Sequence, residues 1–393
     1  MIETLLADAA LAPVLAALPE ARVVGGAVRD ALADRPIADI DLATPVPPEA
    51  TMAALERAGL RAIPTGLSHG TVTAISDGRP FEITTLRRDV ATDGRHAAVA
   101  WTGDWREDAA RRDFTINAMS LDRDGRVHDY FGGEADLAAG RVRFVGHPAI
   151  RIAEDYLRIL RFFRFYARYG RGRPDPAALT AIRDGVPGLG RLSAERVWME
   201  LRKILAAPDP LPAVRLMAAA DVLAAVVPEG ADPAGLEKLI ANRAPPDPLL
   251  RVAALLTGDA ASFAERLKLA NAEAERLAVL RAGPVPVAGD DDAALRRLLA
   301  EEDAALLADR TYLRGGPDPD FATLRARLLA MARPVFPLEG RDALALGARP
   351  GPAVGEALRE TRAVWLAGGC VADKAALLPV LRARLDDRTA THC

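Results

Sequence analysis

The stretch VVGGAVRDALADRPIADIDLAT, residues 23–44, predicts a strand, a glycine turn and a helix in close succession. The predicted strand ends at Val24, and the helix begins at Ala27. Between them, Gly25 and Gly26 carry no Cβ, so their backbone N–H groups can approach a phosphate at the positive end of the helix. A glycine pair is also typical of a plain turn, so the residues that follow decide between the two interpretations.

Two aspartates near the end of this stretch form the pattern Asp39-Ile40-Asp41. Alternate residues of a strand point to one face, so we expect both carboxylates on one face and Ile40 in the core. Adjacent carboxylates repel each other unless a cation lies between them. Mg²⁺ prefers oxygen ligands and is often held by one or two carboxylates together with substrate phosphates. Asp39 and Asp41 are therefore the candidate metal ligands and catalytic residues, the alternative being a solvated strand edge.

The spacing of these groups is similar to a known pattern. GG-x-x-RD, residues 25–30, followed by D-x-D resembles the nucleotidyltransferase superfamily that includes DNA polymerase β. The rest of the chain resembles one branch of it, the class II tRNA nucleotidyltransferases (CCA-adding enzymes) and the related bacterial poly(A) polymerases. The stretches that carry the resemblance are FEITTLRRD (81–89), RRDFTINAM (111–119), DYFGGEADL (129–137), GRVRFVG (140–146), EDYLRILRFFRF (154–165), LSAERVWMELRKIL (192–205) and PVFPLEGRDALALGARPGPAVGEAL (334–358).

The texture of the sequence changes near residue 149. Before it, short runs rich in Val, Ile, Thr and Phe alternate with short helical segments, whereas helical periodicity dominates after it. Pattern and resemblance together predict an α+β protein, with a polymerase β-like mixed sheet and helices in the head followed by an all-α neck, body and tail. The predicted segments are the catalytic head (1–148), the neck that recognises the nucleotide base (149–206), the body (207–318) and the tail that binds tRNA (319–393).

Several arginines are candidates for binding a triphosphate. Arg111 and Arg112 are adjacent, and guanidinium groups match phosphate oxygens well. The alternative for this pair is a salt-bridged helix face with Glu107 and Asp108. We assign Arg29 to the same task because it follows the glycine turn, which itself contributes Gly25 and Gly26.

A second group of residues is a candidate for selecting the base. Asp155 and Arg158 are three residues apart within the predicted helix 152–169, and are expected to be neighbours. A carboxylate accepts from the exocyclic amine of cytosine or adenine, whereas guanine and uracil carry a carbonyl there. The alternative is an ordinary surface ion pair of little energetic value. The resemblance matches E-D-x-x-R at these positions, and we add Arg161 and Arg164 of the same helix to the nucleotide site.

Residues 141–173 are rich in arginine and aromatic side chains. Such a composition is found in nucleic-acid surfaces, but here the aromatic spacing favours the buried stripe of an amphipathic helix.

The segment 87–105 has mixed charge and no clear period, which predicts a long mobile loop beside the site. The resemblance implies that such a loop helps the change from C to A addition, and a loop without a role is the alternative. We assign Arg87, Arg88 and Asp89 of this segment to positioning, together with Asn117, which lies in a strand-like run and is alternatively a core amide.

The last part of the chain contains a glycine-rich turn before a helix predicted to begin near residue 352. Arg349 and the free N–H groups at Gly351 are candidates for a tRNA phosphate contact. An ordinary helix start is the alternative.

Composition limits the other possibilities. The formal net charge is −3, so bulk charge is not the means of holding RNA. Cys370 and Cys393 are the only cysteines, and no histidines are paired at metal-ligand spacing, which excludes a disulfide framework or a zinc knuckle. No apolar run is long enough for a membrane span, and the first residues lack the basic start of a signal peptide. We therefore expect a cytoplasmic protein, and no protein partner can be inferred.

These observations predict a Mg²⁺-dependent enzyme that adds CMP and AMP from CTP and ATP to the 3′ end of tRNA, releasing pyrophosphate. A poly(A) polymerase shares almost every stretch but is expected to carry a strongly basic extension. CC-only and A-only tRNA nucleotidyltransferases are further alternatives. An inactive RNA-binding scaffold is a remote one, because a scaffold has no need of two crowded carboxylates.

Overall fold

The computed structural model describes residues 1–92, 97–316 and 319–390, except for the side chains of 89–92, 97–99 and 388–390. The chain divides into two compact units, Met1–Pro228 and Glu229–Cys393. Among the described residues, no helix combines the length and apolar character needed to cross a bilayer.

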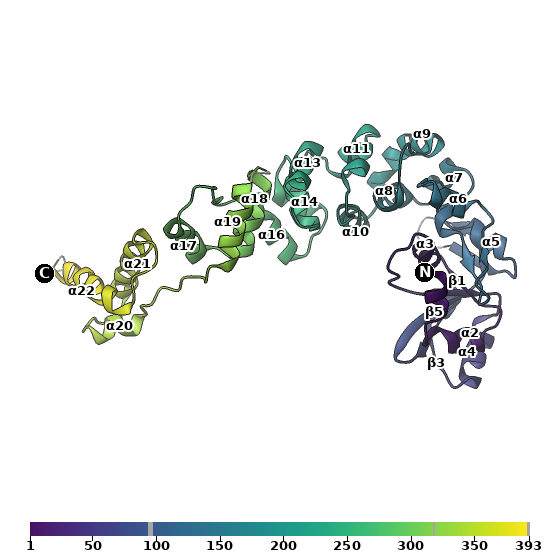
Figure 1. Ribbon diagram of the computed structural model, residues 1–393, viewed down its shortest axis with the longest axis horizontal. Helices are drawn as coiled ribbons and strands as arrows, with labels where there is room; N and C mark the ends of the chain where they lie inside the picture. The colour runs from purple at the N-terminus through teal and green to yellow at the C-terminus, as the bar shows by residue number, and fades with distance from the viewer. Residues whose placement is uncertain (93–96, 317–318, 391–393) are drawn as a thin grey trace. The chain divides into compact units, whose positions relative to one another are not determined.

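The first unit is built on a mixed sheet of seven strands in the order β3-β4-β5-β2-β1-β8-β9 (Figure 1). β2 and β5 pair in parallel and the other neighbours are antiparallel. The strands are β1 (Arg22–Val24), β2 (Asp41–Thr44), β3 (Arg61–Gly66), β4 (Thr71–Ser76), β5 (Arg79–Thr85), β8 (Ser120–Leu121) and β9 (Val127–His128). The expected mixed sheet is confirmed.

Short helices surround this sheet, and α2 and α4 pack against β4. The glycine turn after β1 leads directly into α3, so the predicted strand–turn–helix unit is present. The helical elements of this part are α1 (Ile2–Leu6), α2 (Leu11–Ala17), α3 (Gly26–Leu32), α4 (Pro48–Arg57), η1 (Leu67–His69), α5 (Trp105–Ala110), η2 (Thr115–Asn117), α6 (Gly133–Ala138) and α7 (Pro148–Glu154).

The expected loop at 87–105 is wrong for the residues that the structure describes. Strands β6 (Arg87–Thr92) and β7 (Ala97–Trp101) pair as a separate antiparallel ribbon, which satisfies backbone groups that a loop would leave to water. Residues 93–96 of the expected loop lie outside the described part. The Trp101 ring lies against Gly70, where a Cβ would come within 2.6 Å of it.

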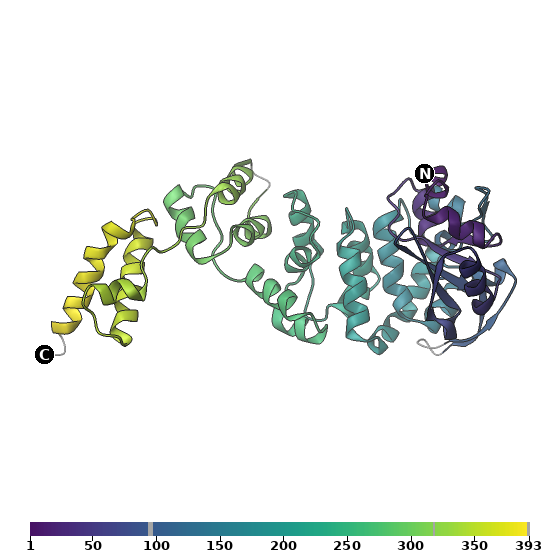
Figure 2. The same ribbon diagram turned by 90° about the horizontal axis from the view of Figure 1, so that it is seen from below.

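The helices that follow stack side by side, as the teal part of Figure 2 shows, with α8 between α10 and α11. As expected, the aromatic side chains Phe162, Phe163 and Phe165 of α8 are buried. These helical elements are α8 (Leu157–Tyr169), α9 (Pro176–Gly185), η3 (Val186–Arg191), α10 (Ala194–Leu205), α11 (Leu211–Ala219) and α12 (Val222–Val226).

In the described part of the second unit, the regular elements are helices joined by irregular segments. One core cluster joins Leu295 and Leu307 to Leu324 of α19, and another surrounds Trp365 and Leu381. The helices are α13 (Pro233–Ala241), α14 (Pro248–Leu255), α15 (Ala260–Arg266), α16 (Asn271–Arg281), α17 (Asp292–Glu301), α18 (Ala304–Arg314), α19 (Pro319–Ala330), α20 (Gly340–Ala345), α21 (Pro352–Ala367) and α22 (Lys374–Ala390). The α+β head and all-α remainder are confirmed, whereas the four segment boundaries stay a prediction.

Candidate active site

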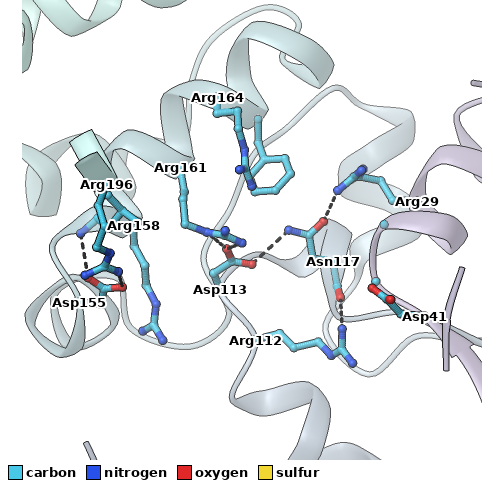
Figure 3. A pocket seen from close by; sticks show the side chains of 14 residues that line it. Arg29, Asp41, Arg112, Asp113, Asn117, Asp155, Arg158, Arg161, Arg164 and Arg196 are labelled. Carbon is cyan, nitrogen blue, oxygen red and sulfur yellow. Dashed lines mark hydrogen bonds and ion pairs between the residues drawn. The ribbon is translucent and has the colours of Figure 1, made fainter. Parts of the chain in front are cut away.

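A pocket of about 480 Å³ collects most of the predicted site residues within the first unit (Figure 3). It lies among the start of α3, the start of β2, the turn between α5 and η2, and helices α8 and α10. The lining residues are Gly25, Gly26, Arg29, Asp41, Arg112, Asp113, Asn117, Asp155, Leu157, Arg158, Arg161, Arg164, Phe165 and Arg196.

The glycine turn fits closely against a guanidinium group. Gly25 has a φ of 67°, a left-handed conformation that side chains disfavour. A Cβ there would lie 3.0 Å from Nη1 of Arg112. Both facts require glycine at this position, which lets Arg112 reach the pocket.

The two candidate metal ligands do not lie in one strand as expected. β2 begins at Asp41, so Asp39 precedes the strand and the same-face argument does not apply to it. Asp39 is exposed and Ile40 only half-buried. This part of the prediction is wrong because the chain from Asp34 to Asp39 runs as irregular backbone before it joins the sheet.

Asp41 nevertheless lies in a crowded negative environment. The parallel register of β2 and β5 places it opposite Glu82. Desolvation raises the pKa of the Asp41 carboxyl group, the charges of Glu82 and Asp39 raise it further, and Arg112 opposes them. A bound cation would relieve this repulsion, so the donor set fits a metal held by oxygen. The described residues contain no cluster of three or more His, Cys, Asp or Glu side chains that could hold an ion without other ligands.

A continuous hydrogen-bond chain crosses the pocket (Figure 3). Arg29 Nη1 donates to Asn117 Oδ1 at 2.6 Å, and Asn117 Nδ2 donates to Asp113 Oδ1 at 3.1 Å. Asp113 Oδ2 accepts from Arg161 Nε at 2.6 Å. Asn117 belongs to the 3₁₀ turn η2 and not to the strand-like run that was expected, and this turn aims its amide at both partners.

Arg111 and Arg112, which are adjacent in sequence, have different surroundings. Arg112 lines the pocket, and burial lowers its pKa while Asp108 opposes that shift. Arg111 does not line the pocket and pairs with Asp108 at 2.8 Å. The alternative interpretation, a salt bridge on the helix face, therefore describes Arg111. Asp108 also pairs with Arg112, with 3.4 Å between Oδ2 and Nη2.

The expected neighbours Asp155 and Arg158 do not contact each other as an ion pair. The predicted helix 152–169 is broken at Asp155, whose φ of −156° and ψ of 107° are extended, so the i,i+3 spacing no longer applies. Asp155 instead pairs with Arg196 of α10 at 2.7 Å, and Arg158 pairs with Glu154. Both residues still line the same pocket.

Arg164 of α8 is fixed by packing. Arg164 pairs at 2.9 Å with Glu200, a buried residue of α10, and its guanidinium group lies 4.6 Å from the centre of the Phe165 ring. Because Glu200 and Phe165 fix it from two sides, Arg164 faces the pocket with little freedom.

Other predicted residues lie outside the pocket lining. Arg87 donates to the carbonyl oxygen of His69 at 2.8 Å, and Arg88 is exposed. The side chain of Asp89 lies outside the described part. Arg349 and Gly351 are exposed in the second unit, before α21, which begins at Pro352 close to the expected position.

Comparisons with known proteins show which family the chain belongs to. Residues 21–143 match the family model described as the Poly A polymerase head domain, and residues 173–232 match one described as the probable RNA and SrmB-binding site of polymerase A. The chain is 37% identical to the human mitochondrial CCA tRNA nucleotidyltransferase 1 over 92% of its own length and 86% of that protein. The chain belongs to the CCA tRNA nucleotidyltransferase family.

Further members of the family match parts of the chain. The zebrafish mitochondrial CCA tRNA nucleotidyltransferase 1 is 51% identical over 47% of this chain and 44% of that protein. The crystal structure of the Bacillus stearothermophilus CCA-adding enzyme with CTP has a TM-score of 0.76 at 26% identity, covering 98% of this chain and 100% of that one. The Thermotoga maritima CCA-adding enzyme with tRNA has a TM-score of 0.64 at 22% identity, over 92% of this chain and 91% of that one, and shows the shared fold alone.

The expected family and nucleotidyltransferase class are therefore confirmed, and this family is generally metal-dependent.

Sequence reasoning missed three charged residues in or beside this candidate site. Asp113 follows the arginine pair, Glu82 lies in FEITTLRRD, and Arg196 lies in LSAERVWMELRKIL. All three lie within stretches that carry the family resemblance, which was the signal that could have found them. Each has one partner that is distant in sequence (Arg161 for Asp113, Asp41 for Glu82 and Asp155 for Arg196), and no local spacing could show these three contacts.

Proposed function

We propose that this chain adds CMP and AMP from CTP and ATP to the 3′ end of tRNA and releases pyrophosphate. The observation that carries the proposal is a single pocket that combines Asp41, arginines suited to phosphates, and Asp155 with Arg158 for the base, in a chain related to the human enzyme over most of its length. The Bacillus stearothermophilus relative binds CTP and the Thermotoga maritima relative binds tRNA, which supports these substrates.

The triphosphate is assigned to the end of the pocket near α3. Gly25 and Gly26 keep side chains out of this region, and Arg29 and Arg112 bring two positive charges to it. Arg29 is held by Asn117, which limits its movement when a nucleotide binds. Guanidinium groups fixed in this way position the phosphates for in-line attack, which supplies most of the rate enhancement in transfers of this kind.

Asp39 and Asp41 are assigned to Mg²⁺, with Glu82 as a neighbouring third carboxylate. The metal, when bound, activates the primer hydroxyl group and offsets the charge that develops on pyrophosphate. The 3′ hydroxyl group of the RNA loses its proton to solvent as its oxygen attacks the α-phosphorus. A new P–O bond forms, and the bond to the leaving pyrophosphate breaks. The arginines at the triphosphate end stabilise that leaving group electrostatically.

Asp155 and Arg158 are assigned to the base, with Arg161 and Arg164 on the adjacent turns of α8. Asp155 accepts from the exocyclic amine that cytosine and adenine share, and Arg158 donates to the neighbouring ring acceptors. Arg196 holds Asp155 through their ion pair, so α10 contributes to the selection of the base. This selection uses protein side chains and needs no nucleic-acid template.

The tail, residues 319–393, is assigned to tRNA, with Arg349 and Gly351 as phosphate contacts. Arg87, Arg88, Asp89 and Asn117 are assigned to positioning. Cysteine usage favours a cytosolic location, although two of the similar proteins are mitochondrial.

One experiment tests this function. Purified protein is incubated with a tRNA transcript lacking its CCA end, with each nucleotide alone and with CTP and ATP together. We expect addition of two residues with CTP alone and three with both nucleotides. A long ladder with ATP alone would identify a poly(A) polymerase, and a stop after CC with both nucleotides would identify a CC-only enzyme. A-only activity would require a primer already ending in CC. If no pyrophosphate is released on any primer, the inactive RNA-binding scaffold is the remaining alternative.

A further inference from the structure

A second cavity, of about 790 Å³, lies at the opposite end of the two helices that form the active site. The start of α3 and the first turns of α8 line the active-site pocket, whereas the ends of both helices line this one, together with α6. We call it the rear pocket. Its charged lining residues are Asp34, Arg35, Glu134, Arg168 and Arg171.

The arginines of the rear pocket carry charge that the surrounding protein does not neutralise. Among the described residues, none of their guanidinium groups takes part in a hydrogen bond or an ion pair. Arg168 and Arg171 are exposed, and Arg35 is half-buried with its guanidinium group 4.8 Å from the centre of the Tyr169 ring. Three guanidinium groups around one cavity outnumber its two carboxylates, and guanidinium groups suit the oxygens of a phosphate group.

Tyr169 connects the rear pocket to the active site. Its ring is in contact with the guanidinium groups of both Arg35 and Arg29, the latter at 4.5 Å from the ring centre. Its hydroxyl group donates to Asp30, whose other oxygen lies 3.0 Å from Arg29. The rear pocket is therefore rigidly joined to a residue that we assign to the triphosphate.

We infer that the rear pocket binds a backbone phosphate of the RNA strand whose 3′ end is extended. This inference rests on the proposed function. From Gly26 to Ala33, α3 spans about 10 Å at about 1.5 Å per residue. A strand that passes both pockets would therefore meet the rear pocket within a few nucleotides of its 3′ end. The active-site pocket already supplies the groups for one nucleotide, which leaves the rear pocket for the primer.

The first test compares RNA binding by the wild type and by the double variant Arg168→Ala/Arg171→Ala. Affinity for tRNA lacking its CCA end is measured by fluorescence anisotropy at several salt concentrations. We expect about tenfold weaker binding and a salt slope smaller by about 0.7 for each phosphate that the variant no longer neutralises. CTP affinity should not change. Arg61→Ala, which removes an exposed arginine on β3, is the matched control and should bind RNA like the wild type.

The second test locates the phosphate. Primers carry one uncharged methylphosphonate linkage at each of the last five positions. One of these linkages should weaken binding to the wild type and have no further effect on the double variant, because both changes remove the same interaction.

Equal effects on both proteins at every position, or unchanged RNA binding by the double variant, would overturn the inference. Because the active site also binds pyrophosphate, the anion test counts sites. A second pyrophosphate site that the wild type has and the double variant lacks, without any change in RNA affinity, would assign the pocket to a free anion and also overturn the inference. The wild type's own nucleotide addition separates the two proposals. An active wild type whose rear-pocket variant binds RNA normally contradicts the inference alone, whereas an inactive wild type contradicts the proposed function.

Discussion

Asp113 and Arg161 form an ion pair that joins the turn after α5 to helix α8, 48 residues later in the chain, with 2.6 Å between Oδ2 and Nε. The other carboxylate oxygen accepts from the backbone N–H of Phe114 and from Asn117. Because Asp113 is buried and both its oxygens are occupied, it fixes the sheet-bearing part of the first unit to α8 across the active-site pocket.

Replacing Asp113 with Asn should destabilise the first unit and weaken nucleotide binding together. Removing the charge leaves Arg161 without its anion inside the pocket, at a cost of about 2–3 kcal/mol. Urea unfolding and CTP titration measure the two effects. Asp124→Asn, which changes an exposed aspartate 86% accessible to solvent, is the control and should alter stability by less than about 0.5 kcal/mol. Equal stability of the two variants would show that the pair has no structural role.

The same carboxylate should shape the stability of the protein in acid. Burial alone would raise the pKa of Asp113, but Arg161, Asn117 and the N–H of Phe114 together hold it below its ordinary value of 3.8. Its contribution to folding is therefore complete above pH 3.8 and is lost as the pH falls through the lower, folded-state pKa. We expect the free energy of unfolding of Asp113→Asn to fall less steeply than that of the wild type below pH 3.8. Parallel curves would contradict this.

Asp39→Ala and Asp41→Ala should each lower the rate of nucleotide addition at least about 10³-fold, equivalent to about 4 kcal/mol of transition-state stabilisation. The fold should persist, because removing a repelled carboxylate costs no packing. Single-turnover rates with Mg²⁺ measure the loss, and circular dichroism checks the fold. Glu56→Ala, on the exposed face of α4, should retain full activity. A rate within tenfold of wild type for either aspartate variant would rule out its role as a metal ligand.

Asp155→Ala should reduce the preference for C over U and for A over G by about 5- to 150-fold, the value of one good base contact. Arg196→Ala should reduce it in the same direction by a smaller factor, because Asp155 stays in place but loses the group that orients it. Arg158→Ala should lower kcat/KM for both CTP and ATP. Measuring kcat/KM for all four nucleotides tests these outcomes, with Arg183→Ala on α9 as control. Wild-type selectivity in Asp155→Ala would place base choice elsewhere.

Arg349→Ala should weaken tRNA binding by about three- to tenfold and leave CTP binding unchanged, because the side chain is exposed before α21 and is assigned to a backbone phosphate. Its effect should shrink as salt rises. Arg382→Ala on α22 provides an exposed comparison in the same unit. If both variants bind tRNA equally well, Arg349 makes no specific contact.

Local pattern was sufficient wherever neighbours in sequence are also neighbours in space. The glycine turn between β1 and α3, the buried aromatic stripe of α8 and the start of α21 all follow from spacings of a few residues. The same local reasoning was wrong at Asp155, where an extended residue interrupts an apparently continuous helical period, and at β6 and β7, whose pairing depends on backbone partners several residues away.

The sequence by itself determined the order of elements, the family and the residue types that gather in the active site. Only the tertiary structure decided that Asp155 pairs with Arg196, 41 residues away, that Asp113 joins Arg161, and that the arginines of the rear pocket surround one cavity. The physical reason is that packing of α8 against α10 and against the turn after α5 sets these distances. Side-chain periodicity records which face of a helix is buried, but not which distant charge that face will meet.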